Sequence, residues 1–144
     1  MFQVVEYKRN DMMISTNRAL IQMDRVCEFL AQSYWANQRE RTTIIQSIEH
    51  SLCFSLFHGQ TQIGFARVVT DGATFAYLCD VFIDEAYRGR ELGKWLVECV
   101  LQHPDLLNIR RFLLVTKDAH GLYQPFGFEV LHEPDQFMEI FRHC

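Results

Sequence analysis

The amino-acid sequence predicts an α+β fold with a mixed central sheet. Three neighbouring runs, at 51–58, 62–70 and 73–83, are rich in β-forming residues and alternate with period two. Short turns that contain glycine separate these runs at 59–60 and 71–72, so we expect an antiparallel meander. Before and after the meander, apolar residues recur at the spacing of one helix face, which adds helices to both halves of the chain.

The segment before the meander predicts two short strands and two helices. Residues 2–8 and 12–15 alternate weakly around a polar turn, which favours a pair of strands. From Leu20 to Ala31 the apolar residues follow one face of a helix. A second helix is expected over 43–50, where isoleucines gather on one face.

The segment after the meander predicts a helix, a strand, a short helix and a closing hairpin. An amphipathic pattern over 90–102 indicates the helix, and the apolar run 111–116 indicates the strand. The short helix is expected over 119–126. Residues 128–132 and 136–141 are then expected to close the fold as a β-hairpin.

Composition indicates one globular domain that spans residues 1–144. Of the 144 residues, 49% are hydrophobic and 22% are charged, which suits a packed core, and no repeat or linker interrupts them. The net charge of -4 argues against a nucleic-acid-binding protein, which needs a basic face. No apolar run approaches the ~20 residues of a membrane span. We therefore expect no membrane partner. The histidines lack metal-ligand spacing, so no metal partner is expected either.

Targeting and cysteine patterns indicate the cytoplasm. The first residues lack the charged region and apolar stretch of a secretory signal peptide. The 5 cysteines are an odd number, are widely scattered and include no Cys-x-x-Cys pair, which indicates reduced thiols. We therefore expect a cytoplasmic protein.

A strand–turn–helix segment at 78–94 is the first feature that indicates chemistry. The turn holds Arg88, Gly89 and Arg90 and leads directly into the expected helix. The first amides of a helix lack internal partners and lie at the positive end of its dipole, so they can bind a diphosphate. The side chains of Arg88, Arg90 and Lys94 add positive charge around them. The alternative is an ordinary turn with solvated arginines.

A second feature is the tyrosine of the short helix at 119–126. Tyr123 follows Thr116 and Ala119 and precedes Gly127-Phe128, where the next strand is expected to begin. A tyrosine hydroxyl can donate a proton to a departing thiolate, because the two groups have similar pKa values. The alternative is a packing residue whose hydroxyl has a structural partner.

Together, these segments resemble the GCN5-related N-acetyltransferase (GNAT) family over about residues 62–128. The matching motifs are Val81-x-Ile83, Arg88-x-x-x-x-Gly93 and Thr116-x-x-Ala119-x-x-Leu122-Tyr123-x-x-x-Gly127-Phe128. The resemblance implies a mostly antiparallel sheet flanked by helices on both faces. The sequence departs from the family pattern at Glu91, where the loop usually has a glycine, and at Thr116, where asparagine is common.

The resemblance also implies the reaction, which is direct transfer of an acetyl group from acetyl-CoA to an amine in a ternary complex. Backbone groups at Val81, Phe82 and Ile83 would pair with the pantetheine arm, and an N–H near Val81 would stabilise the oxyanion. Tyr123 would protonate the leaving CoA thiolate. The other implied cofactor-binding residues are Arg88, Gly89, Arg90, Glu91, Leu92, Gly93, Lys94, Thr116 and Ala119.

The reaction needs a base, because an amine is mostly protonated at pH 7. Asp80 is the candidate, since it lies in an apolar strand beside the expected thioester position and burial would raise its pKa. Two alternatives stay open. Asp80 can form an ion pair with Arg67 on the adjacent strand, and a chain of water molecules can remove the proton instead.

The resemblance places the acceptor between the first two helices, their loop and the sheet. Tyr34 and Trp35 fall in that loop, where aromatic faces can hold an ammonium group. Arg67 and Tyr77 on the sheet can line the same pocket, and an arginine there favours a substrate with a carboxylate. The alternative for the two loop aromatics is that they cap the core.

The sequence therefore favours an acetyl-CoA-dependent N-acetyltransferase that acts on a small-molecule amine. Two alternatives remain: acetylation of a peptide or protein amine, and a CoA-binding module without turnover. The fold also allows a homodimer through the C-terminal strands or the sheet edge, and no residue decides the oligomeric state.

Overall fold

A computed structural model describes residues 2–142, which form a six-stranded sheet with strand order β1-β2-β3-β4-β5-β6. The strands are β1 (Glu6–Arg9), β2 (Met12–Ser15), β3 (Leu52–His58), β4 (Thr61–Thr70), β5 (Phe75–Ile83) and β6 (Arg111–Leu114). Each of the first four strands pairs antiparallel with the next, whereas β5 and β6 are parallel. The expected mixed, mostly antiparallel sheet is therefore confirmed.

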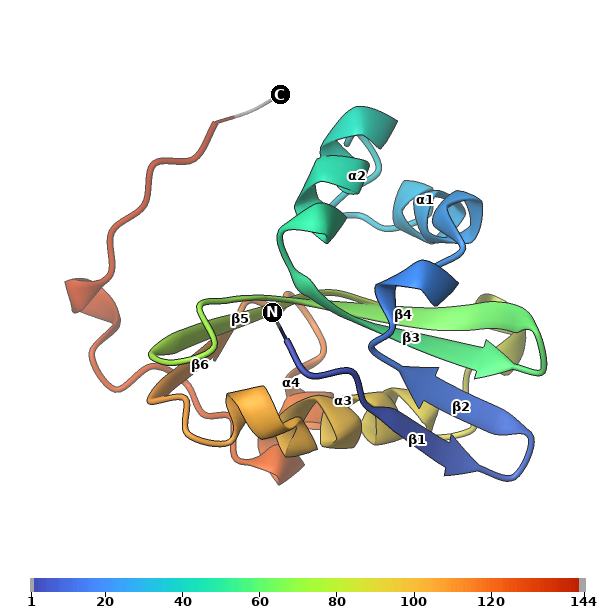
Figure 1. Ribbon diagram of the computed structural model, residues 1–144. Coiled ribbons are helices and arrows are strands. Elements are labelled where there is room, and N and C mark those ends of the chain that lie inside the picture. The colour runs from blue at the N-terminus through green and yellow to red at the C-terminus, as the bar shows by residue number, and fades with distance from the viewer. Residues whose placement is uncertain (1, 143–144) are drawn as a thin grey trace.

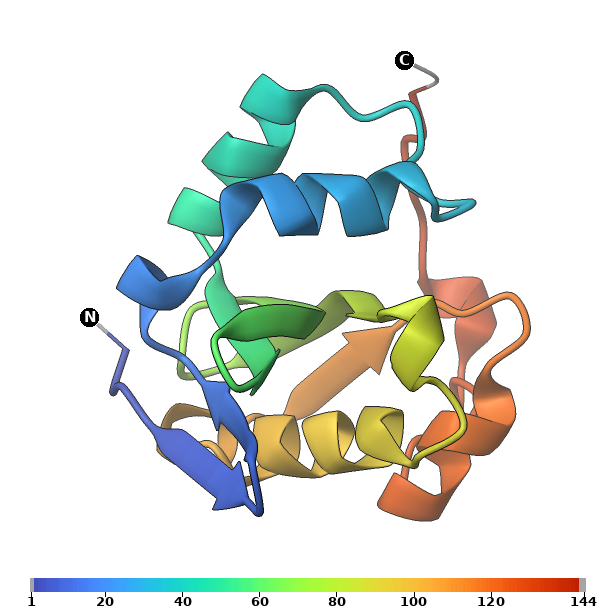
Figure 2. The ribbon, with the colours of Figure 1, turned by 90° about the vertical axis from the view of Figure 1, so that its right-hand side faces the viewer.

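Helices cover both faces of the sheet, as expected (Figures 1 and 2). On one face lie α1 (Met23–Ala31) and α2 (Arg41–Glu49), and on the other lie α3 (Leu92–Gln102) and the short α4 (His120–Tyr123). Each layer buries an apolar cluster against the sheet. The cluster under α1 and α2 includes Val26, Phe29, Ile44, Ile48, Phe65 and Phe82. The cluster under α3 includes Ile14, Phe54, Leu78, Trp95, Leu96 and Val100.

Strand β5 contributes to both clusters because its alternation is interrupted. Ala76 and Leu78 pack in the cluster under α3, whereas Phe82 packs in the cluster under α1 and stacks on Phe29 with ring centroids 5.0 Å apart. Residues separated by an even number along a regular strand share a face. A β-bulge between β4 and β5 breaks that regularity, so the side chain of Phe82, which follows the bulge, lies on the opposite face of the sheet from Leu78.

Helix α1 begins at Met23, later than the expected start at Leu20, because a 3₁₀ turn occupies the residues before it. Residues 18–20 form a 3₁₀ turn, from which Arg18 reaches the end of α2. Its Nη2 donates to the carbonyl oxygens of Ile48 at 2.7 Å and Glu49 at 2.6 Å. The last carbonyls of a helix have no partner within it, so Arg18 caps α2 and joins the N-terminal segment to it.

The closing hairpin that the sequence predicted over 128–132 and 136–141 is wrong. Within residues 2–142 no strand follows β6. Phe128 instead packs edge-on against Phe112 of β6, and the chain then turns through a 3₁₀ segment at Pro134–Gln136. Pro134 supplies no N–H to a ladder, and beyond this turn the chain runs away from the sheet (Figure 1). Residues 136–141 alternate as a strand would, but in the described part of the chain they pair with no strand of the sheet.

Candidate active site

The parallel pair β5–β6 separates before β5 ends, which leaves an open edge. Backbone pairing stops at Leu78 and Leu114, although β5 continues to Ile83. The last part of β5 therefore pairs only with β4. Val81, Phe82 and Ile83, expected to bind the pantetheine arm, all lie on this part of the strand. An extended ligand can pair with such an edge as an added strand.

The open edge begins at the bulge, and Asp80 is its distinctive residue. The β4–β5 register runs from Phe65 opposite Phe82 to Arg67 opposite Cys79, so β5 holds one extra residue there. Asp80 adopts a left-handed backbone with φ of 52°. Aspartate tolerates this conformation better than most residues with a side chain. A bulge of this kind disrupts the ladder and redirects side chains next to functional sites.

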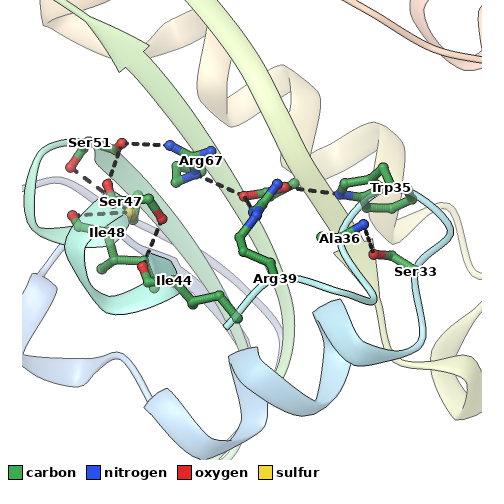
Figure 3. Close-up of polar contacts among 11 residues, drawn as sticks. Ser33, Trp35, Ala36, Arg39, Ile44, Ser47, Ile48, Ser51 and Arg67 are labelled. Atoms are coloured by element: carbon green, nitrogen blue, oxygen red, sulfur yellow. Dashed lines mark hydrogen bonds and ion pairs between the residues drawn. The ribbon is translucent and has the colours of Figure 1, made fainter. Parts of the chain in front are cut away.

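The buried Asp80 carboxylate lies at the centre of a polar cluster. The side chains of Trp35, Arg39 and Arg67, labelled in Figure 3, point toward one another around it. The carboxylate accepts hydrogen bonds from Trp35 Nε1 at 2.9 Å, Arg39 Nη1 at 2.8 Å and Arg67 Nε at 2.9 Å. Arg67 also donates Nη1 to Ser51 Oγ at 3.1 Å. The structure thus brings together Trp35, Arg67 and Asp80, which the sequence placed in the site, and two arginines face one carboxylate.

The two arginines determine the ionisation of Asp80. Burial alone would raise its pKa, but the charges and hydrogen bonds of Arg67 and Arg39 outweigh burial and hold the pKa below its usual range. The carboxylate is therefore ionised and fully engaged at neutral pH. This is the ion-pair alternative that the sequence left open, extended by a second arginine.

Arg39 is the site residue that sequence reasoning missed. It lies in the loop between α1 and α2, 41 positions from Asp80 along the chain, and its side chain is 24% exposed. No period or motif marks a loop arginine. The available signal was the charge of Asp80 itself, because a buried carboxylate needs partners.

The loop aromatics extend the site toward α4. Tyr34 and Trp35 pack edge to face with centroids 5.1 Å apart, and both are substantially exposed. The Tyr34 hydroxyl accepts from the backbone N–H of Lys117 at 3.3 Å, and Lys117 Nζ lies 5.4 Å from the Tyr34 ring centroid. Tyr77 is half-buried, and its pKa is raised by burial and then by the charges of Cys79 and Asp80. It therefore lies beside the polar cluster.

Tyr123 is buried in α4, at the other side of the open edge. Its ring contacts Phe128 edge-on, at 5.9 Å between centroids. Burial, followed by the charge of Tyr34, raises its pKa to about 12, so the phenol is protonated at neutral pH. Thr116 accepts a hydrogen bond from the backbone N–H of Ala119 at 2.9 Å. Both residues thus form the turn that leads into α4.

The expected diphosphate loop joins the end of β5 to α3. Arg88 donates Nε to the carbonyl of Ile83 at 3.0 Å, and its guanidinium lies 5.1 Å from the centroid of Phe82. Arg90 lies over the ring of Tyr87 at the same distance, 5.1 Å. Both arginines are exposed and held on aromatic faces, which keeps their charges beside the start of α3.

Glu91 occupies the N-cap position of α3 without capping it. Its backbone is left-handed, with φ of 60°, and its side chain makes no hydrogen bond to the helix amides. The carboxylate instead accepts from Lys94 Nζ at 3.1 Å. The first amides of α3 therefore keep their capacity to bind an anion. Leu92 is buried in the core, and a side chain at Gly93 would meet Leu122 of α4 at 4.0 Å.

The expectations on metal sites, membrane spans and cysteines concern residues 2–142, the part of the chain that the structure describes. Across 2–142, no group of histidine, cysteine, aspartate and glutamate side chains is arranged to hold a metal ion. No helix in the same range is long and apolar enough to span a membrane. Cys27, Cys53, Cys79 and Cys99 are free thiols, and Cys144 lies outside the described residues.

Comparison with known proteins identifies the family. The model of the acetyltransferase (GNAT) family matches residues 18–128. A GNAT-family protein from Xanthomonas campestris pv. campestris, solved by crystallography, is 42% identical with a TM-score of 0.88, covering 91% of this chain and 93% of that one. A candidate acetyltransferase of Gibberella zeae is 27% identical over 138 residues, 81% of this chain and 78% of that protein.

A more distant structure shares the fold alone. An aminoglycoside N-acetyltransferase solved in complex with CoA gives a TM-score of 0.67 at 16% identity, covering 97% of each chain. The family match extends over most of the chain and includes the open edge of β5, the loop before α3 and the helix of Tyr123. The chain therefore belongs to the GCN5-related N-acetyltransferase family, and it is an acyltransferase that takes its acetyl group from acetyl-CoA.

Proposed function

We propose that this chain acetylates the amine of a small molecule that carries a carboxylate, with both substrates bound at once. The observation that carries the proposal is the Asp80 cluster, which lies at the bulge where the open edge of β5 begins. It combines two arginines with one carboxylate, so one positive charge is left without an internal counterion. Beside it stand two exposed aromatic rings, Tyr34 and Trp35.

The residues present fit acetyl-CoA, which would supply the acetyl thioester. Backbone groups of Val81, Phe82 and Ile83 would bind its extended arm along the open edge of β5. The amides at the start of α3 would bind the diphosphate, with Arg88 and Arg90 adding charge. An N–H freed from the ladder by the bulge would donate to the thioester carbonyl oxygen, where negative charge develops.

The reaction needs two proton transfers, one to the leaving sulfur and one from the amine, and in this proposal Tyr123 performs the first and water the second. Tyr123, with a pKa of about 12, holds its proton at neutral pH and would donate it to the leaving sulfur. Asp80 is a weak proton acceptor, because three donors already bind its carboxylate and its pKa is lowered. We therefore assign Asp80 to positioning Trp35 and Arg39, and assign removal of the amine proton to water.

The acceptor follows from the charge and shape of the cluster. Arg39 is partly exposed and keeps donors beyond those that bind Asp80, so it would bind a carboxylate of the substrate. The faces of Tyr34 and Trp35 would contact the rest of the molecule. A protein or peptide acceptor stays the alternative, as does a CoA-binding module without turnover.

Two experiments test the proposal in sequence. Thermal unfolding with acetyl-CoA at 100 times its dissociation constant should show ~2.7 kcal/mol of added stability. Thiol release is then measured with pairs of small amines that differ only in a carboxylate. Preference for the carboxylate member supports the proposal. Equal rates contradict the carboxylate assignment. Cofactor binding without thiol release from any amine favours the module without turnover.

A further inference from the structure

The loop between β5 and α3 begins at Asp84, whose carboxylate binds two different parts of the chain. Its Oδ1 accepts from the backbone N–H of Ala86 at 3.1 Å and caps the 3₁₀ turn Glu85–Tyr87. Its Oδ2 accepts from Arg25 Nη2, on α1, at 2.7 Å. The Asp84 side chain therefore joins the loop expected to bind the diphosphate to the helix layer on one face of the sheet.

Arg25 is fixed by contacts beyond this ion pair. Its Nε donates to the backbone carbonyl of Gln62 at 3.1 Å, and its Cζ atom lies 5.0 Å from the ring centroid of Phe29. The Arg25 and Asp84 side chains are 32% and 24% exposed. Ion pairs at the open surface contribute little, but this pair is partly shielded from water and its arginine is held by two further groups. Arg25 is therefore a fixed partner of Asp84.

Arg88 lies at the other end of the same 3₁₀ turn, as the residue that follows it. The pKa of Asp84 is lowered by the backbone hydrogen bond from Ala86, by Arg25 and by the charge of Arg88, so both arginines act on one carboxylate. Within residues 2–142, however, Arg88 forms no ion pair with Asp84, whose two oxygens bind Ala86 and Arg25. Arg25 thus occupies the group that would otherwise compete for Arg88.

Arg88 keeps part of its guanidinium available to a ligand. Its Nε donates to the Ile83 carbonyl and its Cζ atom lies over the Phe82 ring, so backbone and ring together position the head group. In the described part of the chain its two Nη groups have no hydrogen-bond partner. Paired N–H groups of an arginine suit a phosphate. Phe82 stacks on Phe29, on which Arg25 lies, so the two arginines contact the two rings of one aromatic pair.

We propose that Arg25 is a positioning residue for the cofactor: by occupying the Asp84 carboxylate, it leaves Arg88 free to bind the diphosphate of acetyl-CoA. This inference rests on the proposed binding of the diphosphate at this loop. Without Arg25, the Asp84 carboxylate draws Arg88 to itself across the turn, and the guanidinium then offers less charge to a phosphate. Arg25 acts through Arg88, and a residue of α1 thereby controls the affinity of the cofactor loop.

The first test is calorimetric titration of folded protein with CoA. Arg25→Met removes the charge and keeps the length of the side chain, so the dissociation constant should rise about tenfold, the lower end for one charge-assisted hydrogen bond. Arg41→Met is the matched control, because Arg41 pairs with Asp24 at the open surface of the same helix layer, and it should bind CoA as the unmodified chain does. An unchanged constant in Arg25→Met, or an equal loss in the control, overturns the proposal.

The decisive variant restores binding. Asp84→Asn, added to Arg25→Met, keeps an oxygen that caps the turn but removes the charge that would hold Arg88. The double variant should bind CoA nearly as tightly as the unmodified chain. If Arg25 only supports the fold, removing its partner restores nothing, and that result overturns the proposal. Asp84→Asn alone, which keeps Arg25, gives an independent reading: CoA binding should be unchanged or tighter, and weaker binding also overturns the proposal.

A shorter ligand separates this inference from the proposed function. Pantetheine lacks the diphosphate, so its affinity, measured by NMR titration, should be the same in the unmodified chain and in Arg25→Met. An equal loss for pantetheine and CoA means that Arg25 does not act at the diphosphate, which overturns this inference alone. If the unmodified chain binds CoA no more tightly than pantetheine, the loop holds no diphosphate, and the proposed cofactor site and this inference are both overturned.

Discussion

Asp80 and Arg39 form an ion pair of 2.8 Å that joins the loop between α1 and α2 to the bulge of β5. One partner is buried and the other is partly open to solvent, with side-chain exposures of 2% and 24%. Because Asp80 also binds Trp35, one carboxylate sets the positions of two loop side chains over the open edge. The loop conformation and the strand conformation are therefore coupled through a single group.

Replacing Arg39 should weaken acceptor binding and leave the cofactor unaffected. Arg39→Gln removes a charge-assisted contact worth ~1.5–3 kcal/mol, so KM for a carboxylate-bearing amine should rise about tenfold or more. The dissociation constant for acetyl-CoA should be unchanged. Arg41→Gln is the control, since Arg41 pairs with Asp24 on the surface at exposures of 53% and 83%. An unchanged KM in Arg39→Gln removes this residue from the acceptor site.

The ionised state of Asp80 should appear in the pH dependence of stability. The arginines lower its pKa in the folded state, so the carboxylate stabilises the fold at pH values above its ordinary pKa of about 3.9. That contribution is lost as the pH falls through the lower folded-state pKa. Asp80→Asn should be roughly 3–5 kcal/mol less stable at pH 7, because it leaves the two arginines without their carboxylate. Its free energy of unfolding should also fall less steeply in acid.

The same variant separates a base from a positioning residue. If Asp80 positions the loop, kcat/KM of Asp80→Asn should fall while the shape of its pH profile is kept. If Asp80 is the base, the acidic limb of the profile should disappear. The second result, measured with folded protein, would restore the general-base assignment.

Tyr123→Phe should reduce turnover with little effect on cofactor affinity. General acid catalysis contributes ~100-fold or more, so kcat should fall by about that factor. Tyr87→Phe is a suitable control: the Tyr87 hydroxyl lies 2.8 Å from His58 Nδ1, in a hydrogen bond between β3 and the loop before α3. Its loss should affect stability more than kcat. A decrease of less than tenfold in Tyr123→Phe would exclude this tyrosine as the acid.

Changing Glu91 should tighten cofactor binding. A left-handed backbone costs a residue with a side chain ~1–2 kcal/mol, a cost that glycine avoids. Glu91→Gly removes this strain and a negative charge beside the expected diphosphate, and it releases Lys94 from its ion pair. Glu91→Gln removes the charge alone, so comparing the two separates charge from backbone. Calorimetric titration with CoA measures both, and weaker binding in either variant would contradict the expectation.

Periodicity predicted the sheet and its helices well, because each layer has one apolar face. It did not predict the bulge, since Asp80 takes a left-handed conformation that a glycine would have signalled. It also missed Arg39, whose partner is distant in sequence. At 136–141 the alternation was real, but pairing depends on which edge lies within reach, and the turn at Pro134–Gln136 directs the chain away from its own sheet.

The change of face within β5 has a consequence for how the molecule unfolds. Leu78 is fixed in one apolar cluster and Phe82 in the other, only four positions apart on the same strand. If either helix layer unpacks, β5 loses the contacts that fix it on that side, and the other layer packs on the same strand. The two halves of the molecule should therefore melt in a single cooperative transition, with no state in which one layer survives alone.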